Sequence, residues 1–338
     1  MKNQNITNKS NFLKKIFIKF CRILGYEIID QANYEVPSLK KDLGDTLSIP
    51  GKKSITVPLG EVSITRKVKS VKILFRSCTS ELIMDQNKKR LFDQKKSEYT
   101  LRSLNSLLKS ITFAKNTFNK ISFEIIITDT NSYSNDIDKM NSILSKYEIK
   151  NKIVIINTKE FENKIIGNYS NAKFANMANL YTSLELVKNN NEDIVYFVED
   201  DYIHTKRAIL EMLFTYEKIS SMLNTDIFLL PADYPFLYSK SNSTKIFLGH
   251  KSHWRLVDES LVTFMTSKKI ILQSMDAFME MATEWKDPWE KPLHDIYKNI
   301  PCFSPIPSLS MHCANINSAF GLPPNIDWKK LWEENSNF

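Results

Sequence analysis

Short apolar runs separated by helix-length segments dominate the chain from residue 70 onwards. These runs lack the polar alternation of a strand with one solvated face, so we expect a parallel sheet that is covered on both sides. Apolar residues recur at helical spacing between the runs, as in residues 101–118, 174–187 and 205–223. The expected strands are VKILFRS, SFEIIITDT, KIVIINT, DIVYFV and DIFLL. The pattern predicts a doubly wound, mostly parallel α/β fold with helices on both faces.

The pattern weakens past about residue 240, which predicts a smaller mixed C-terminal region. TKIFLGH and SLVTFMT are typical of strands, and the proline-rich PCFSPIPSLSMHC is typical of an ordered loop. Helices are expected at 268–283, at 290–299 and in DWKKLWEEN. We therefore divide the chain into a basic leader (1–30), a linker or small β-rich extension (31–68), an α/β half (69–235) and a C-terminal region (236–338).

The leader, NFLKKIFIKFCRILGYEII, combines an apolar helical face with basic residues. Leu13, Ile16 and Phe20 share one face, while Lys19 and Arg22 lie elsewhere. Charges interrupt it too often for a signal-peptide core, and the chain has no apolar run long enough to span a membrane. Such a helix suits an anionic membrane surface, and two alternatives are docking on the domain and a frayed leader. We expect a cytoplasmic protein, peripheral to the inner face of the membrane if the leader binds there.

Composition excludes several classes of protein. The 338 residues carry a net charge of +8, but basic and aromatic residues do not interleave as in nucleic-acid modules, so no nucleic-acid partner is expected. The chain has seven glycines and neither GxGxxG nor GxxxxGK[ST], which argues against dinucleotide and P-loop sites. Its four cysteines lack zinc-like spacing and are expected to be reduced thiols.

Three consecutive carboxylates follow the apolar run DIVYFV. In open α/β sheets, ligands bind beyond the carboxyl ends of the strands. Adjacent acids repel one another, and a hard divalent cation with oxygen ligands relieves this while leaving room for phosphate oxygens. The alternative is a solvated turn whose acids favour the positive end of the helix at 205–223. The candidate site is Glu199, Asp200 and Asp201.

VYFVEDDYIHTKRAILEML resembles the metal-binding segment of GT-A glycosyltransferases, especially the family 2-like group, in which an apolar strand ends in an Asp-x-Asp-type motif and an amphipathic helix follows. NAKFANMANLYTSLELVKNNNED resembles the Asn-bearing helix that leads into that strand. The resemblance spans roughly 70–235 by order of elements and is specific around 171–215. It implies a GT-A-type fold, a nucleotide diphosphate sugar as donor, and Mn²⁺ or Mg²⁺. The motif here is Glu-Asp-Asp, which leaves open which acid contacts the metal.

The resemblance also implies roles for individual residues. Asp201 is expected to bind the metal directly, Glu199 to reach the metal or the donor ribose, and a late histidine, His312, to complete the site. The ends of the first two strands are expected to cradle the nucleotide, and the Asn-bearing helix to border the donor sugar. The residues expected around the donor are Arg76, Ser77, Asp129, Asn176, Asn179 and Asp200.

Inverting sugar transfer needs a base that takes a proton from the acceptor hydroxyl. Asp287 is the first candidate, because it lies between Trp285 and Trp289 and aromatic faces suit sugar rings. Asp258 in HWRLVDES is the second, and the further candidates are Glu259, Glu284 and Glu290. An Asp before Pro is also a common turn residue, which is the structural alternative for Asp287.

We therefore expect a metal-dependent glycosyltransferase of surface polysaccharide synthesis. It would move a sugar from a nucleotide donor bound by residues 69–235 to a glycan or lipid-linked acceptor. The alternatives are a metal-dependent nucleotidyl or phosphoryl transferase, a non-catalytic nucleotide-sugar or glycan-binding protein, and a basic membrane-surface scaffold.

Overall fold

The computed structural model describes residues 12–26, 28, 48–56, 60–80, 90–189, 192–239, 243–314 and 317–338. Within those ranges, every helix is too short or too polar to traverse a bilayer. Part of the leader and much of the segment 31–68 lie outside the described residues.

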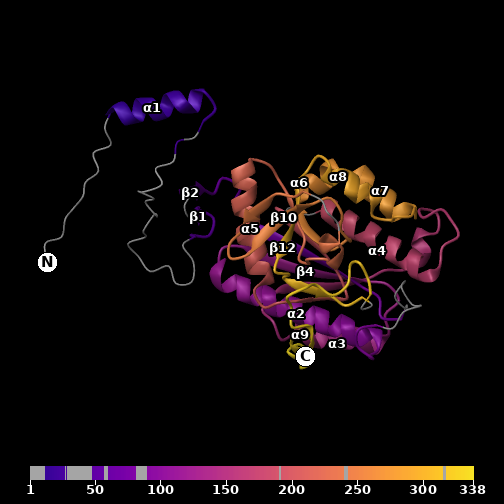
Figure 1. Cartoon of the computed structure of the whole chain (residues 1–338). Helices are drawn as coiled ribbons and strands as arrows, with labels where there is room; N and C mark the ends of the chain where they lie inside the picture. The colour runs from indigo at the N-terminus through magenta and orange to yellow at the C-terminus, as the bar shows by residue number, and fades with distance from the viewer. Residues whose placement is uncertain are drawn as a thin grey trace, which may run out of the picture.

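One mixed sheet of nine strands runs through the described chain (Figure 1). The first four strands in the order below are mutually parallel, whereas β11 runs antiparallel to both of its neighbours. The strand order is β5 (Lys150–Ile155), β4 (Ser122–Asp129), β3 (Ser70–Ser77), β6 (Ile194–Glu199), β11 (Phe264–Ser267), β8 (Phe228–Leu229), β12 (Cys302–Ile306), β10 (His253–Val257) and β9 (Ile246–Leu248).

Helices cover both faces of this sheet, as Figure 1 shows. On one face, α2 (Lys96–Thr117) packs against α3 (Ser134–Leu144) and α5 (Ala208–Leu223). The other face carries α4 (Asn171–Lys188), α6 (Lys268–Gln273), α7 (Met275–Thr283) and α8 (Lys291–Tyr297). The buried positions of α2 include the predicted apolar stripe of Leu101, Leu104, Leu108 and Ile111. The predicted α/β class, mostly parallel in its core, is confirmed.

The interpretation of PCFSPIPSLSMHC as a loop is wrong, because it contains two strands. β12 lies inside the sheet, and β13 (Ser310–His312) pairs antiparallel with β7 (Tyr202–His204). Proline weakens a strand prediction because it cannot donate a backbone hydrogen bond. Within β12, β8 pairs with Cys302 and Phe303, so Pro305 lies beyond that ladder and pairs with Trp254 of β10. The helix expected over 268–283 is likewise two helices that meet at Ser274.

The N-terminal elements are α1 (Phe12–Ile23) and a hairpin of β1 (Lys53–Thr56) and β2 (Gly60–Ser63). Glu217 of α5 connects the segments on either side of this hairpin to the helix. Its carboxylate accepts hydrogen bonds from the backbone N–H groups of Gly51 and Val68, each at 2.9 Å. The remaining elements are the short 3₁₀ helices η1 (Thr158–Phe161) and η2 (Pro235–Tyr238) and the C-terminal helix α9 (Trp328–Glu333).

Candidate functional site

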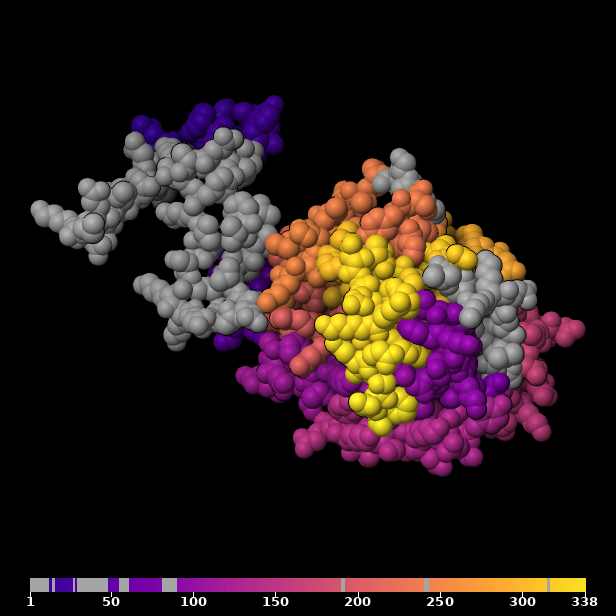
Figure 2. Space-filling view, turned by 60° about the horizontal axis from the view of Figure 1, so that its bottom comes forward, coloured from indigo at the N-terminus to yellow at the C-terminus, as the bar shows by residue number. Residues whose placement is uncertain are grey.

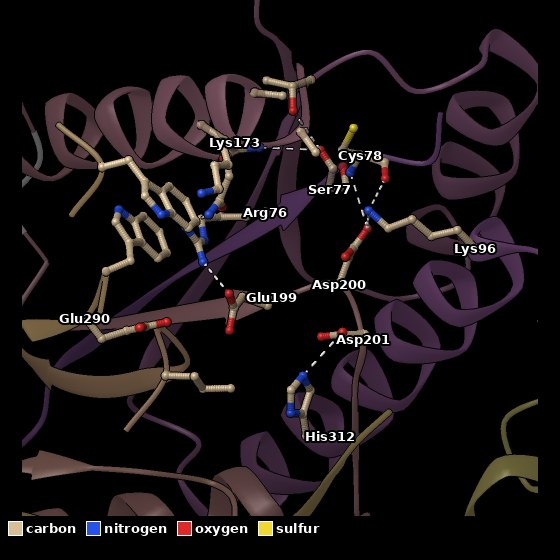
Figure 3. Close-up of a pocket in the computed structure, with 18 of the residues that line it drawn as sticks. Arg76, Ser77, Cys78, Lys96, Lys173, Glu199, Asp200, Asp201, Glu290 and His312 are labelled. Atoms are coloured by element: carbon tan, nitrogen blue, oxygen red, sulfur yellow. Dashed lines mark hydrogen bonds and ion pairs between the residues drawn. The ribbon is translucent and has the colours of Figure 1, made fainter. Parts of the chain in front are cut away.

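The strand register brings three predicted site segments to one edge of the sheet. Ser77 of β3 pairs with Asp129 of β4, and Arg76 pairs with Glu199 of β6. Beyond these carboxyl ends lies a pocket of about 470 Å³, a size that suits a small-molecule ligand. Its lining includes Arg76, Ser77, Asn176, Asn179, Glu199, Asp200, Asp201, Asp287 and His312 of the predicted site (Figure 3).

The first acid of the triplet, Glu199, bonds other protein side chains with both of its carboxylate oxygens. Its Oε1 accepts from Arg76 Nη2 at 2.9 Å, and its Oε2 accepts from Thr263 Oγ1 at 3.1 Å. Burial raises the pKa of Glu199 above its ordinary value, although Arg76 opposes this shift. The Arg76 guanidinium is itself buried and also donates to Asn176 at 3.3 Å. These contacts hold Arg76 on the pocket floor beside Glu199.

The second acid, Asp200, is buried and bound on the side of α2. Its Oδ2 accepts from Thr100 Oγ1 at 2.8 Å and from the backbone N–H of Cys78 at 3.3 Å, and Lys96 Nζ lies 3.6 Å away. Figure 3 shows Lys96 directed at Asp200 and Cys78, and its ammonium also donates to the Cys78 carbonyl. Lys96 is not among the residues that the sequence motif predicts for the site. Its position in the first turn of the helix after β3 was the available signal.

The third acid, Asp201, lies next to His312 in the pocket (Figure 3), with 3.4 Å between its Oδ2 and the histidine Nε2. The His312 Nδ1 bonds the Phe320 carbonyl at 2.6 Å, which makes Nδ1 the donor and leaves Nε2 facing the acid. Burial opposes both charges, yet mutual attraction prevails: the pKa of Asp201 is lowered, and that of His312 is raised to about 9. Pairing of β13 with β7 brings His312 here from late in the chain.

Two other predicted donor residues use their polar groups inside the protein. The carboxylate of Asp129 accepts from Ser77 Oγ at 2.6 Å and from Ser132 Oγ at 2.5 Å, and burial raises its pKa. Asn179 exchanges two 2.7 Å hydrogen bonds with Thr128 of β4. Asp129 therefore orders the loop beneath the pocket, while Asn179, although it lines the pocket, links α4 to the sheet.

The segment that leads into α8 forms the wall opposite the acids. Trp285 and Trp289 stack with ring centroids 4.9 Å apart and planes only 4° from parallel. Asp287 is exposed and accepts from Trp285 Nε1 at 3.1 Å. Glu290 is partly buried, and burial raises its pKa to about 7, with Glu199 adding to the shift. The pKa of Glu290 suits a base at neutral pH.

Two predicted residues do not line this pocket: Asp129 contacts it only through Ser77, which does, and Asp258 lies elsewhere. Asp258 is exposed and lines a separate hollow of about 630 Å³ with Arg255 and Tyr297. Asp258 directly follows β10, a strand that the sequence did not predict. The sequence therefore could not indicate where in the sheet Asp258 would lie.

The fit of a divalent ion is tested by the donor atoms present. Among the described residues, no three His, Cys, Asp or Glu side chains are grouped as a metal centre. Asp201 Oδ2 and His312 Nε2 suit two neighbouring ligand positions, since ligands about 2.0–2.2 Å from one ion stand roughly 3–3.5 Å apart. Glu199, the third predicted ligand, is engaged by Arg76 and Thr263. The pair fits an ion that takes its other ligands from substrate phosphate and water.

The sheet order, the antiparallel strand β11 and an acidic triplet at the carboxyl end of β6 define a GT-A-like α/β fold. No family model and no curated protein matches the chain.

Several solved structures are similar to it. S. aureus TarS shares 14% identity over 70% of this chain and 36% of its own, with a TM-score of 0.40. A UDP-glucose pyrophosphorylase complexed with UDP-glucose shares 10% identity over 79% of this chain and 97% of its own, with a TM-score of 0.38. The galactosyltransferase LgtC, in complex with donor and acceptor sugar analogs, shares 8% identity over 67% of this chain and 66% of its own, with a TM-score of 0.30. The chain thus spans about a third of the full TarS chain. Because these similarities are weak, we argue function from the site.

Proposed function

We propose that this chain is a metal-dependent glycosyltransferase that moves a sugar from a nucleotide diphosphate sugar to a hydroxyl acceptor. The observation that carries the proposal is the facing pair of Asp201 and His312 in a pocket at the carboxyl ends of parallel strands. Such a pair suits an ion that also binds a diphosphate, and across the same pocket lies a carboxyl poised to accept a proton near neutral pH.

In the proposed donor site, the three acids at 199–201 have different roles. Asp201 and His312 would hold Mn²⁺ or Mg²⁺, which would supply positive charge to the diphosphate leaving group. Asp200 positions Lys96, whose ammonium lines the pocket beside the acids. Glu199 and Arg76 neutralise each other on the floor. The nucleotide itself would lie toward Ser77 and the loop that Asp129 orders.

Glu290 is the proposed general base, and Asp287 is the second candidate. The ionised Glu290 takes the proton of the acceptor hydroxyl as that oxygen bonds to the anomeric carbon. The bond from this carbon to the diphosphate oxygen breaks, and the nucleoside diphosphate leaves with the electron pair. A single displacement of this kind inverts the anomeric centre. The Trp285–Trp289 stack beside Glu290 offers an apolar edge for a sugar ring.

The wider setting that we propose is bacterial surface polysaccharide assembly with a glycan or lipid-linked acceptor. Supporting this, α1 exposes large apolar side chains together with basic ones, as a helix on an anionic membrane surface does. The exposed apolar residues of α1 include Phe12, Leu13, Ile16, Phe17, Phe20 and Ile23.

The experiment is thermal unfolding of wild type and Asp201→Ala with UDP, GDP, CMP and dTDP, each with and without Mn²⁺. A ligand at about a hundred times its Kd stabilises by roughly 2.7 kcal/mol, which shifts the midpoint measurably. We expect one nucleotide to shift the wild type in a Mn²⁺-dependent way and Asp201→Ala to abolish the shift. A folded wild type that responds to no nucleotide would contradict the proposal. With donor and acceptor present, release of nucleoside diphosphate rather than pyrophosphate separates sugar transfer from nucleotidyl transfer.

A further inference from the structure

Arg90, just ahead of α2, has two buried guanidinium nitrogens, Nη1 and Nη2. Within the described part of the chain, neither its Nη1 nor its Nη2 has a hydrogen-bond partner. The guanidinium lies over the ring of Tyr99, 4.6 Å from the ring centroid. A cation over an aromatic face gains some attraction, but its N–H groups remain unbonded. Buried polar groups are nearly always bonded, so such a group indicates an absent ligand or water.

Other buried arginines nearby have protein carboxylates for partners. Arg76 pairs with Glu199 at 2.9 Å. Arg102 lies over the Trp332 ring, as Arg90 lies over Tyr99, but also pairs with Glu98 at 2.7 Å. Stacking on an aromatic ring therefore does not prevent an arginine in this region from bonding an anion. Arg90 differs because, among the residues that the structure describes, no carboxylate bonds its two Nη atoms.

A cluster of apolar residues from distant segments fixes the position of Arg90. Phe92 stacks on Trp332 of α9 at 3.9 Å between centroids, and the Tyr99 hydroxyl exchanges hydrogen bonds with the Phe92 backbone. In Figure 2 the C-terminal segment, in yellow, spreads over one face of the molecule against purple residues near the start of α2. This packing fixes Phe92 and Tyr99, and with them the ring over which Arg90 lies.

This cluster adjoins the metal side of the pocket. Thr100, the residue after Tyr99, bonds Asp200, and Cys313, in the same cluster as Tyr99, donates its backbone N–H to the Asp201 carbonyl at 2.9 Å. The Tyr99 ring, with the Arg90 guanidinium over it, therefore belongs to the cluster that adjoins Asp200 through Thr100 and Asp201 through Cys313.

We propose that Arg90 binds a phosphate oxyanion beside Asp201, and that in the proposed reaction this is the β-phosphate of the donor. A planar guanidinium fork matches two phosphate oxygens, and the pairing would satisfy both Nη atoms. On departure of the nucleoside diphosphate, negative charge grows on this phosphate, so Arg90 stabilises the leaving group. The inference rests on the proposed function for the identity of the ligand, but not for the anion site itself.

The test compares wild type, Arg90→Met and Arg90→Lys by calorimetric titration. The probes are the nucleoside diphosphate that stabilises wild type best, the corresponding nucleoside, and inorganic pyrophosphate, each with Mn²⁺. We expect Arg90→Met to weaken nucleoside diphosphate binding about 10- to 100-fold, as for loss of a charge-assisted hydrogen bond, and to leave the nucleoside unchanged. Arg90→Lys keeps the charge without the fork and should fall between. Arg102→Met is the matched control: it should lower stability yet keep wild-type affinity for the diphosphate.

The outcomes separate this inference from the proposed function. Unchanged diphosphate affinity in a folded Arg90→Met, or an equal loss for nucleoside and diphosphate, overturns the role of Arg90. If Arg90→Met does not fold, wild-type diphosphate affinity in Arg90→Lys overturns it in the same way. If wild type binds no nucleotide, the proposed function fails, and pyrophosphate then decides the anion site. It must bind wild type more tightly than either Arg90 variant for the site to stand.

Discussion

The pKa of the Glu290 carboxyl group is shifted in opposite directions by burial and by charged residues that line the same pocket. Burial favours its protonated form and Glu199 adds to this, while Arg76 favours the ionised form, with a net pKa of about 7. A base at that pKa is ionised in an appreciable fraction of molecules at neutral pH and still attracts a proton strongly. Asp287, three residues earlier, is exposed and bonded to an indole N–H. The two carboxyls share a turn but lie in different surroundings.

If Glu290 is the base, it must be ionised to work, so sugar transfer should fall as pH decreases below about 7 and level off above it. Glu290→Gln should remove this dependence and lower kcat about 10²- to 10⁴-fold, the usual contribution of general-base catalysis. Asp287→Asn is the control and should keep the rate and the pH profile of wild type. Initial rates from pH 5 to 9 measure both effects. The reverse pattern would transfer the role to Asp287.

At the scale of elements, Asn179 of α4 has a role in the structure that differs from the one predicted from the sequence: it was expected beside the donor sugar, but its amide links α4 to the sheet. Asn179 faces the sheet, donates to the Thr128 carbonyl and accepts from the Thr128 hydroxyl, each at 2.7 Å. The helix also packs against α7 on the same face of the sheet. The amide therefore sets the rotation of α4, and with it the direction in which Asn176 meets Arg76.

Asn179→Ala should accordingly lower the free energy of unfolding by about 1–3 kcal/mol, because Thr128 then loses partners inside the protein. Urea unfolding followed by far-UV circular dichroism measures this change. Thr182→Ala is the control in the same helix. Its hydroxyl bonds only the Ala178 carbonyl within α4, at 2.9 Å, so we expect a change within about 0.5 kcal/mol. Equal effects of the two substitutions would refute the linking role of Asn179.

At the scale of the whole molecule, α1 differs from the other helices in what it exposes. Its Phe17 and Phe20 side chains are 58% and 56% exposed, whereas α2 and α5 bury most of their apolar residues. Lys19 and Arg22 of α1 are exposed as well. Apolar area together with basic charge favours an anionic lipid surface, where the helix would hold the enzyme near a lipid-linked acceptor.

Phe17→Glu with Phe20→Glu should therefore weaken binding to phosphatidylglycerol vesicles at least tenfold, because both apolar contacts are lost and negative charge is added. Vesicle co-sedimentation measures this, and added salt should weaken wild-type binding as it screens the basic residues. Ile166→Glu introduces charge at a residue that is 80% exposed on the body and serves as the control. Similar losses from both changes, or no binding by wild type, would exclude α1 as the anchor.

Much of the α/β half was predictable because its signals are local. Buried strands such as β3 and β6 are continuous apolar runs, and α2 and α5 show apolar residues at helical spacing. Parallel strands end at a common edge, so the triplet of 199–201 could be placed beside Arg76 and Asp129 from the order of elements. The prolines of β12 misled the prediction, since whether a missing N–H matters depends on the neighbouring strand.

The sequence by itself thus determined the class of fold and the edge of the sheet at which the charged residues lie. It did so because the spacing of apolar residues and the order of strands and helices are properties of short segments of the chain. Only the tertiary structure decided what each charge meets. It turned Asp200 toward Lys96, paired Asp201 with His312, and placed Asp258 at another hollow. It also left both Nη atoms of Arg90 without a hydrogen-bond partner among the described residues. Partners, burial and therefore pKa arise from segments far apart in the chain, and no local spacing records which of them will meet.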